Sequence, residues 1–286
     1  MSGEEPVGPL QAKMLKAKEI SDEEKLYRYN GVLYSTLLSP EEHLKCLEKM
    51  QAREDDIMLV AYPKCGFNWM VGVMRKIIAA ATGVKSESKI PPLMEFYGPE
   101  NLKVESVLKS NLCVFLAQIL VVFRNPKDTM VSFYHFSNSN PALPSAKSWD
   151  TFYSQFMSGE VAWGSYFDHA LGWEKKMDDP NVMVVTYEEM KQDLSESIRK
   201  VSSFYGFSLT DAQVQQIADA STFKAMKESS ASSHGNMGNV FFRKGEVGDW
   251  KNHFTPEQSR EMDEVFNKRL AGTKIGAKLN YQAHCQ

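Results

Sequence analysis

The chain of 286 residues is 43% hydrophobic and 24% charged, which is an ordinary composition for a globular protein with room for one large α/β domain or two small ones. Its formal net charge of −3 excludes a global basic field of the kind that binds nucleic acid or an anionic membrane surface, so any anion site must be local. The four cysteines form no Cys-x-x-Cys pair, which argues against a zinc site or a disulfide framework and fits reduced thiols.

The first residues of the chain predict little structure. Residues 1–24 are polar, contain no apolar signal-peptide segment and are expected to be flexible. The longest apolar run, residues 113–123, is too short to span a bilayer, so we expect a cytosolic protein that does not enter a membrane. Ser39-Pro40-Glu41-Glu42 predicts the start of a helix, with the serine as its cap. With no internal repeat and no linker, residues 25–286 are expected to form a single domain.

Three continuous apolar runs have the pattern of strands that are buried on both faces: residues 57–61, 119–123 and 182–186. Each leads into a helical pattern, over residues 70–81, 128–136 and 188–205. This alternation predicts an α/β fold with a central parallel sheet flanked by helices. Ligands in such sheets bind at the carboxyl ends of the strands, so the important loops begin at Tyr62, Arg124 and Tyr187.

Further helices are expected over residues 149–158 after a Ser148 cap, over 162–177, and after capping boxes at Thr210 and Thr255. Residues 228–239 lack apolar periodicity and predict a flexible loop.

The first anion signal is the loop after the first strand, Ala61-Tyr62-Pro63-Lys64-Cys65-Gly66-Phe67-Asn68-Trp69. Gly66 allows a tight turn, and the helix that follows aims backbone N–H groups and its positive dipole end at one point. Lys64 adds a full charge. The segment lacks the complete Gly-x-x-x-x-Gly-Lys-Ser/Thr pattern, so an ordinary connection with a solvent-facing lysine is the alternative.

Two further basic segments follow. Arg124-Asn125-Pro126-Lys127-Asp128 leaves an arginine at the end of the second strand, with Ser132 two helical turns on; the alternative is an arginine that only pairs with Asp128. Phe241-Phe242-Arg243-Lys244-Gly245 suits a phosphate beside a flat ring, and its alternative is a solvated charge pair. Three basic loops in an acidic chain favour a ligand with more than one phosphate.

These segments, with Phe242 to Lys251 read in full, resemble the signature segments of the cytosolic sulfotransferases, most closely the 6B subfamily, and the similarity runs from about residue 55 to 286. The resemblance implies binding of 3′-phosphoadenosine 5′-phosphosulfate (PAPS) and transfer of its sulfuryl group to a hydroxyl or amine. It assigns donor binding to Lys64, Cys65, Gly66, Phe67, Asn68, Trp69, Arg124, Ser132, Tyr187, Ser221, Thr222, Phe223, Lys224, Ala225, Met226, Phe241, Phe242, Arg243, Lys244 and Gly245.

Within this set the resemblance implies distinct roles. Lys64 is the catalytic residue, because it neutralises the oxygen that leaves with the phosphate. Trp69 stacks on the adenine, which Tyr187 and residues 221–226 also contact. Arg124, Ser132 and residues 243–245 bind the 3′-phosphate. No metal is implied.

The chain departs from the family at the general base, a histidine that the family supplies from a Thr-His-Leu strand. No histidine lies between His43 and His135, and residues 100–118 run directly into the second strand. A splice form would have this appearance. His135 has a family counterpart that looks structural. At the loop after the first strand, Phe67-Asn68 replaces the family's Thr-Thr, and Cys65 beside Lys64 is either a spectator or an acidic, oxidation-prone thiol.

Three functions are therefore considered. The first is an active PAPS-dependent sulfotransferase, and the second is a catalytically impaired form that binds PAPS or its product PAP (3′,5′-adenosine bisphosphate). The third, a P-loop kinase, lacks the Ser or Thr expected where Cys65 follows Lys64. Phenols, steroids, thyroid hormones and amines are all candidate acceptors. The family's dimer motif is altered from Lys251 onward, which puts a homodimer in doubt.

Overall fold

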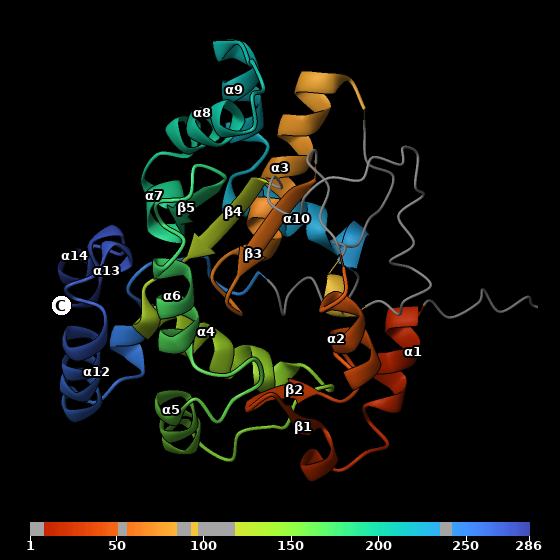
Figure 1. Cartoon of the computed structure of the whole chain (residues 1–286), viewed down its shortest axis with the longest axis vertical. Coiled ribbons are helices and arrows are strands. Elements are labelled where there is room, and N and C mark those ends of the chain that lie inside the picture. The colour runs from red at the N-terminus through yellow and green to blue at the C-terminus, as the bar shows by residue number, and fades with distance from the viewer. Residues whose placement is uncertain (1–8, 51–55, 85–92, 97–117, 235–241) are drawn as a thin grey trace, which may run out of the picture. The chain divides into compact units, whose positions relative to one another are not determined.

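The computed structural model describes residues 9–50, 56–84, 93–96, 118–234 and 242–286, and the chain divides into two compact units (Figure 1). Unit 1 comprises Met1–Met50, Pro92–Asn111 and Tyr134–Ser165, and unit 2 comprises Gln51–Pro91, Leu112–Phe133 and Tyr166–Gln286. Each unit is described by itself. The expected division into a 1–24 segment and a 25–286 domain stays a prediction.

Unit 1 is built from short elements: helix α1 (Pro9–Lys16), the 3₁₀ turn η1 (Asp22–Glu24), strands β1 (Leu26–Tyr29) and β2 (Val32–Ser35), helix α2 (Glu41–Leu47), the turn η2 (Met94–Phe96) and helix α5 (Trp149–Ser158). Strands β1 and β2 pair antiparallel through Asn30-Gly31, both at positive φ, as a two-residue hairpin turn requires. The fully buried Ala17, Leu38 and Ala142 form a small core.

Unit 2 is organised around a parallel sheet in the order β3-β4-β5. Its strands are β3 (Ile57–Ala61), β4 (Gln118–Phe123) and β5 (Val182–Thr186). The helices are α3 (Phe67–Thr82), α4 (Pro126–Ser139, whose last turns belong to unit 1), α6 (Tyr166–Glu174), α7 (Tyr187–Gln192), α8 (Leu194–Phe204), α9 (Asp211–Asp219), α10 (Phe223–His234), the 3₁₀ turn η4 (Asp249–Asn252), α12 (Pro256–Arg269), α13 (Lys274–Lys278) and α14 (Tyr281–Cys285).

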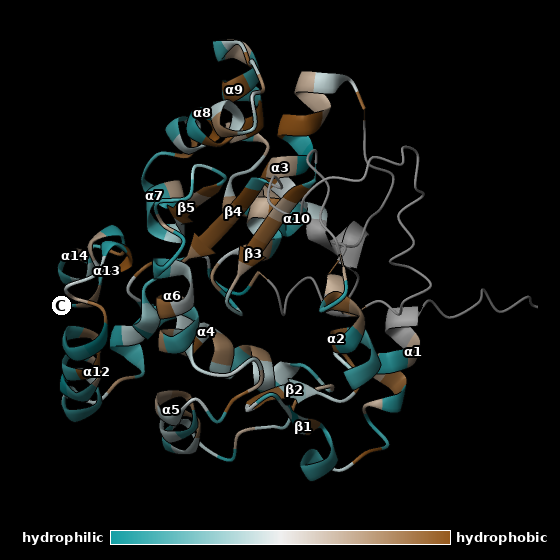
Figure 2. Ribbon diagram, viewed as in Figure 1, coloured by the Kyte–Doolittle hydropathy of each residue, from teal (hydrophilic) through white to brown (hydrophobic). Residues whose placement is uncertain are grey.

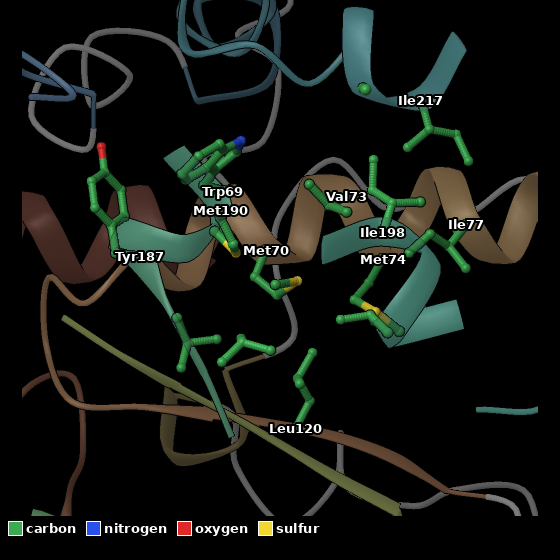
Figure 3. Packing of buried hydrophobic residues seen from close by; sticks show 14 of the residues in the cluster. Trp69, Met70, Val73, Met74, Ile77, Leu120, Tyr187, Met190, Ile198 and Ile217 are labelled. Carbon is green, nitrogen blue, oxygen red and sulfur yellow. The ribbon is translucent and has the colours of Figure 1, made fainter. Parts of the chain in front are cut away.

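The main core of unit 2 lies between the sheet and the helices packed on it. Strands β3 and β4 are almost wholly hydrophobic (Figure 2), as expected for strands that are covered on both faces. Helix α3 presents Trp69, Met70, Val73, Met74 and Ile77 to β4 and to α7, α8 and α9 (Figure 3). This packing fixes the start of α3 at the carboxyl end of β3, where the first anion signal lies.

The structure confirms the α/β class, the three parallel strands and the strand–loop–helix unit, and corrects three local expectations. The helix predicted over 188–205 is broken at Asp193, whose carboxylate accepts the N–H of Glu196 and caps α8. Ser39 does not cap α2; Pro40 occupies that position. Of the loop predicted over residues 228–239, residues 228–234 continue α10, and residues 235–239 lie outside the described residues.

Residues 9–16 form α1 within the segment that was expected to be flexible, and Ala17 after it is fully buried. Within the described part of the chain, no helix has the length and hydrophobicity needed to cross a membrane.

Candidate functional site

The loop after β3 has the geometry of an anion cradle. Lys64 and Gly66 both have positive φ, +69° and +105°, so the chain turns sharply into α3. The first i→i−4 bond of this helix runs from the Met70 N–H to the Gly66 carbonyl, so the N–H groups of residues 67–69 lie ahead of the helical ladder. A Cβ on Gly66 would lie 3.0 Å from the Tyr187 ring, which explains the glycine. This arrangement aims donors and the helix dipole at one place.

Cys65, between Lys64 and Gly66, has a buried side chain. Its thiol is fully buried, lies 3.6 Å from the Thr129 hydroxyl, and its N–H donates to the Tyr62 carbonyl. Burial raises the pKa of the Cys65 thiol to about 12. An acidic, oxidation-prone thiol is therefore wrong, and the spectator reading is correct, because desolvation outweighs the positive groups nearby.

Three cationic side chains from different segments act on one another electrostatically. Burial, together with the positive charges of Arg124 and Arg243, lowers the pKa of Lys64 to about 7. Arg124 comes from the loop after β4, and Arg243 from a segment more than a hundred residues later. The Arg124 guanidinium also donates to the Glu246 carbonyl, three residues beyond Arg243, so the loop after β4 and the last basic segment lie side by side at the carboxyl end of the sheet. Such a cluster favours an anion.

Arg124 is buried and only partly satisfied. Its Nη2 donates to the Glu246 carbonyl at 2.7 Å and lies 3.9 Å from the Asp128 carboxylate. Its Nε is buried and has no hydrogen-bond partner among the described residues. Pairing with Asp128 is therefore loose, and the guanidinium keeps a free donor. Ser132 is partly exposed on the second turn of α4.

Two aromatic rings, those of Tyr187 and Trp69, lie next to Arg124. The Arg124 guanidinium lies 4.4 Å from the centre of the Tyr187 ring, and that ring meets Trp69 edge-on at 5.1 Å (Figure 3 shows both rings). The Trp69 indole N–H donates to the Ser221 carbonyl at 2.7 Å. This contact ties the loop after β3 to the segment that precedes α10.

Residues 221–226 differ in how far their side chains are exposed to solvent. Ser221 is fully buried, and its hydroxyl has no partner among the described residues, whereas Thr222 and Lys224 are exposed. Phe223 packs edge-on against Phe242 at 6.0 Å. Ala225 is partly exposed and Met226 is buried in the core.

The last basic segment is shaped by Gly245 and by Asp249. Gly245 has φ +70°, and a Cβ there would lie 2.1 Å from the Phe223 ring, so only glycine fits. Arg243 and Lys244 both bind the Asp249 carboxylate, at 2.5 and 2.7 Å. A buried acidic side chain therefore holds both cations, which stay partly exposed to solvent. Phe241 lies outside the described residues.

Comparison with known proteins identifies the family. Residues 54–274 match the model of the sulfotransferase domain. The chain is 55% identical to zebrafish sulfotransferase 6B1 (Danio rerio), over 97% of this chain and 99% of that protein, and 42% identical to its human namesake, over 95% and 94%. The crystal structure of mouse sulfotransferase SULT7A1 complexed with PAP superposes with a TM-score of 0.79 at 34% identity, and covers 91% of this chain and 99% of the mouse chain.

The chain belongs to the sulfotransferase family. Its sequence is similar to sulfotransferase 6B1 over nearly its whole length, and its membership of this family rules out the P-loop kinase alternative. The resemblance stated from the three motifs is confirmed, whereas the role of each residue assigned from it stays a prediction.

Sequence reasoning missed three acidic or basic groups that hold this sulfotransferase site together. Asp128 accepts the N–H groups of Gly248 and Trp250 at 2.7 and 3.0 Å, and so joins α4 to the segment after Arg243. Lys127 is fully buried, lies 4.3 Å from the Trp250 ring centre and pairs with Asp263 at 2.6 Å. Asp249 is the third. A carboxylate five residues beyond two adjacent cations was a signal for it; the partners of Lys127 and Asp128 had none.

The described residues hold no cluster of three or more His, Cys, Asp or Glu side chains suited to a metal ion. Of the histidines, His135 is partly exposed on α4, with its ring 5.3 Å from that of Tyr134. Residues 97–117, the part of the chain where the family's histidine strand was expected, lie outside the described residues.

Proposed function

We propose that this sulfotransferase uses PAPS as its donor and transfers the sulfuryl group to a hydroxyl or amine of a small apolar acceptor. The observation that carries the proposal is the electrostatic convergence of Lys64, Arg124 and Arg243 at the carboxyl end of a parallel sheet. Two anionic groups at the two ends of one nucleotide account for three separate basic loops better than a single phosphate does. The PAP complex of mouse SULT7A1 supports the same donor class.

The residues present fit such a nucleotide. The buried Arg124 Nε lacks an acceptor among the described atoms, and Gly66 and Gly245 allow the tight turns of their loops at positive φ. We infer that the N–H groups of residues 67–69 and Lys64 bind the 5′-phosphosulfate end. Arg124, Ser132, Arg243 and Lys244, with the Gly245 turn, bind the 3′-phosphate. Trp69, Tyr187 and residues 221–226 surround the adenine.

PAPS supplies an activated sulfuryl group, and the chain supplies charge and orientation. Lys64 must be protonated to stabilise the negative charge on the leaving phosphate oxygen. In the free protein its pKa is about 7, so an anion beside it stabilises the charged form. The rings of Trp69 and Tyr187 offer the adenine an apolar surface, and the edge-on contact between the two rings holds them in place.

A second function, nucleotide binding without turnover, is favoured by one observation. A general base accepts the proton of the acceptor hydroxyl, and no histidine lies between His43 and His135. Loss of a base costs about 10²–10⁴-fold in rate, so this form is expected to be slow even where it binds its donor well.

Transfer of label from ³⁵S-PAPS tests both functions in one assay. Wild type is incubated with a phenol, a steroid, an iodothyronine and an aryl amine, each beside the Lys64→Ala variant. Labelled product that needs Lys64 supports the enzyme and names its acceptor class. Saturable PAP binding with no product from any acceptor favours the binding function. Neither binding nor product from a folded protein contradicts both.

The remaining expectations follow from the family and not from geometry. We propose a cytosolic location, and acceptors drawn from phenols, steroids, thyroid hormones and amines. A homodimer stays an expectation from the family, which the altered dimer motif after Lys251 weakens.

A further inference from the structure

Asp249 is an almost fully buried carboxylate at the edge of the basic cluster. Its side chain is 3% exposed and binds Arg243 Nη2 at 2.5 Å through one oxygen and Lys244 Nζ at 2.7 Å through the other. Asn252 Nδ2 donates to the Lys244-bound oxygen at 3.0 Å. Burial raises the pKa of Asp249, but the hydrogen bonds from Lys244, Arg243 and Asn252 outweigh it and hold the pKa well below its usual range. The group is therefore charged at neutral pH.

The backbone of Asp249 is held from both sides. The residue follows Gly248, at φ +92°, and opens the 3₁₀ turn η4. The N–H groups of Gly248 and Trp250, one residue before and one after, both donate to the Asp128 carboxylate. The backbone on both sides of Asp249 is thus held by α4 through contacts that do not involve Arg243 or Lys244.

The two cations keep donors for an outside ligand. Arg243 has five N–H groups and Lys244 three, and each uses Asp249 for only part of them. Their side chains are 28% and 43% exposed, whereas the carboxylate behind them is buried. Without that carboxylate, two adjacent like charges would repel one another, and binding would have to order two long side chains, which weakens affinity.

We propose that Asp249 is a positioning residue for the 3′-phosphate: it holds Arg243 and Lys244 in the conformation that receives this group, and so sets the preference for a 3′-phosphorylated nucleotide. The inference rests on the proposed donor site. Asp249 touches no reacting atom, and its effect is exerted through the two cations.

The test is calorimetric titration of wild type, Asp249→Asn and Asp211→Asn with PAP and with 5′-AMP, which lacks the 3′-phosphate. Asp211 is the matched control, because its carboxylate binds Arg199 at 2.8 Å outside the basic cluster. In Asp249→Asn the affinity for PAP is expected to fall about tenfold, the factor that ordering two side chains implies. The affinity for 5′-AMP is expected to stay within about twofold of wild type. Asp211→Asn is expected to change neither.

Two outcomes overturn the proposal while the donor site survives. In one, wild type prefers PAP and Asp249→Asn keeps the whole preference. In the other, the variant binds PAP more tightly, which would make Asp249 a competitor of the phosphate. If wild type itself shows no preference for PAP over 5′-AMP, the proposed function fails instead. An equal loss for both nucleotides in a folded variant also overturns the proposal, since it indicates general damage.

A second variant keeps the test independent of folding defects in Asp249→Asn. Asn252→Ala removes one neutral donor to the carboxylate and leaves every charge in place. It is expected to weaken PAP about threefold and 5′-AMP not at all. In an Arg243→Ala, Lys244→Ala background, Asn252→Ala is expected to have no further effect on PAP, because both cations that Asp249 orients are gone. Additive losses in that background would overturn the proposal.

Discussion

Gly245 gives the sharpest prediction about the shape of the site. A Cβ at this residue would lie 2.1 Å from Cδ2 and 2.4 Å from Cε2 of the Phe223 ring. Normal contact is about 3.5 Å, so the ring or the turn must move by about 1.4 Å. The left-handed φ of +70° costs an alanine about 1 kcal/mol, and overpacking of this kind adds about 1–3 kcal/mol. Gly245→Ala is therefore expected to lower the free energy of unfolding by about 2–4 kcal/mol.

Gly206 provides the control for backbone strain. Its φ is +71°, and nothing lies within 4 Å of the position of its Cβ, so Gly206→Ala carries the strain without the clash. Chemical denaturation of both variants isolates the clash as the difference between them, about 1–3 kcal/mol. Calorimetry should show that only Gly245→Ala loses PAP affinity, by at least about tenfold. Equal stability and equal PAP binding in the two variants would refute the reasoning.

Three further predictions concern charged and titratable groups. PAP affinity should be constant between about pH 6, near the second pKa of a phosphate, and pH 7. Above pH 7 it should fall about tenfold per pH unit, because Lys64, with a pKa of about 7 in the free protein, must then take up a proton. Calorimetry in two buffers at pH 8 should detect uptake close to one proton. Burial lowers the pKa of His169 from 6.5 to about 4, so the folded state favours the neutral ring. The free energy of unfolding should therefore be unaffected by this histidine above pH 6.5 and should fall by about 1.4 kcal/mol per pH unit from there towards pH 4. In His169→Leu this part of the curve of stability against pH should be flatter. Lys127→Met should lower the free energy of unfolding by about 2–4 kcal/mol, because Asp263 loses its buried partner. Lys278→Met, which breaks a more exposed ion pair, should lower it by less than about 1 kcal/mol in the same denaturation assay.

The strands and the anion cradle could be predicted because their signals are local. A continuous apolar run followed by Tyr62-Pro63-Lys64 predicts both the strand and the loop at its end. The parallel sheet follows because this pattern occurs three times along the chain. Two other local signals were present and overlooked. Asn30-Gly31 is a strong hairpin signal, and Asp193 with Glu196 three residues on marks the start of a helix.

The charge network of the site could not be predicted because it depends on contacts between distant segments. Arg124-Asn125-Pro126-Lys127-Asp128 contains two cations that look alike in sequence. The fold leaves one nitrogen of Arg124 without a partner and buries Lys127 against Trp250 and Asp263. Only the tertiary structure separates the cation that can bind a ligand from the cation that holds the chain together.

The most direct test of the donor site is calorimetric titration of the purified wild-type protein with PAP, with 5′-AMP and the Arg243→Ala variant as controls. Two or more charge-assisted hydrogen bonds to the 3′-phosphate predict that wild type binds PAP at least about 100-fold more tightly than 5′-AMP. Arg243→Ala should remove at least about tenfold of that preference. Equal affinities for the two nucleotides in a folded wild-type protein would contradict the account, because the three basic loops would then have no second phosphate to bind.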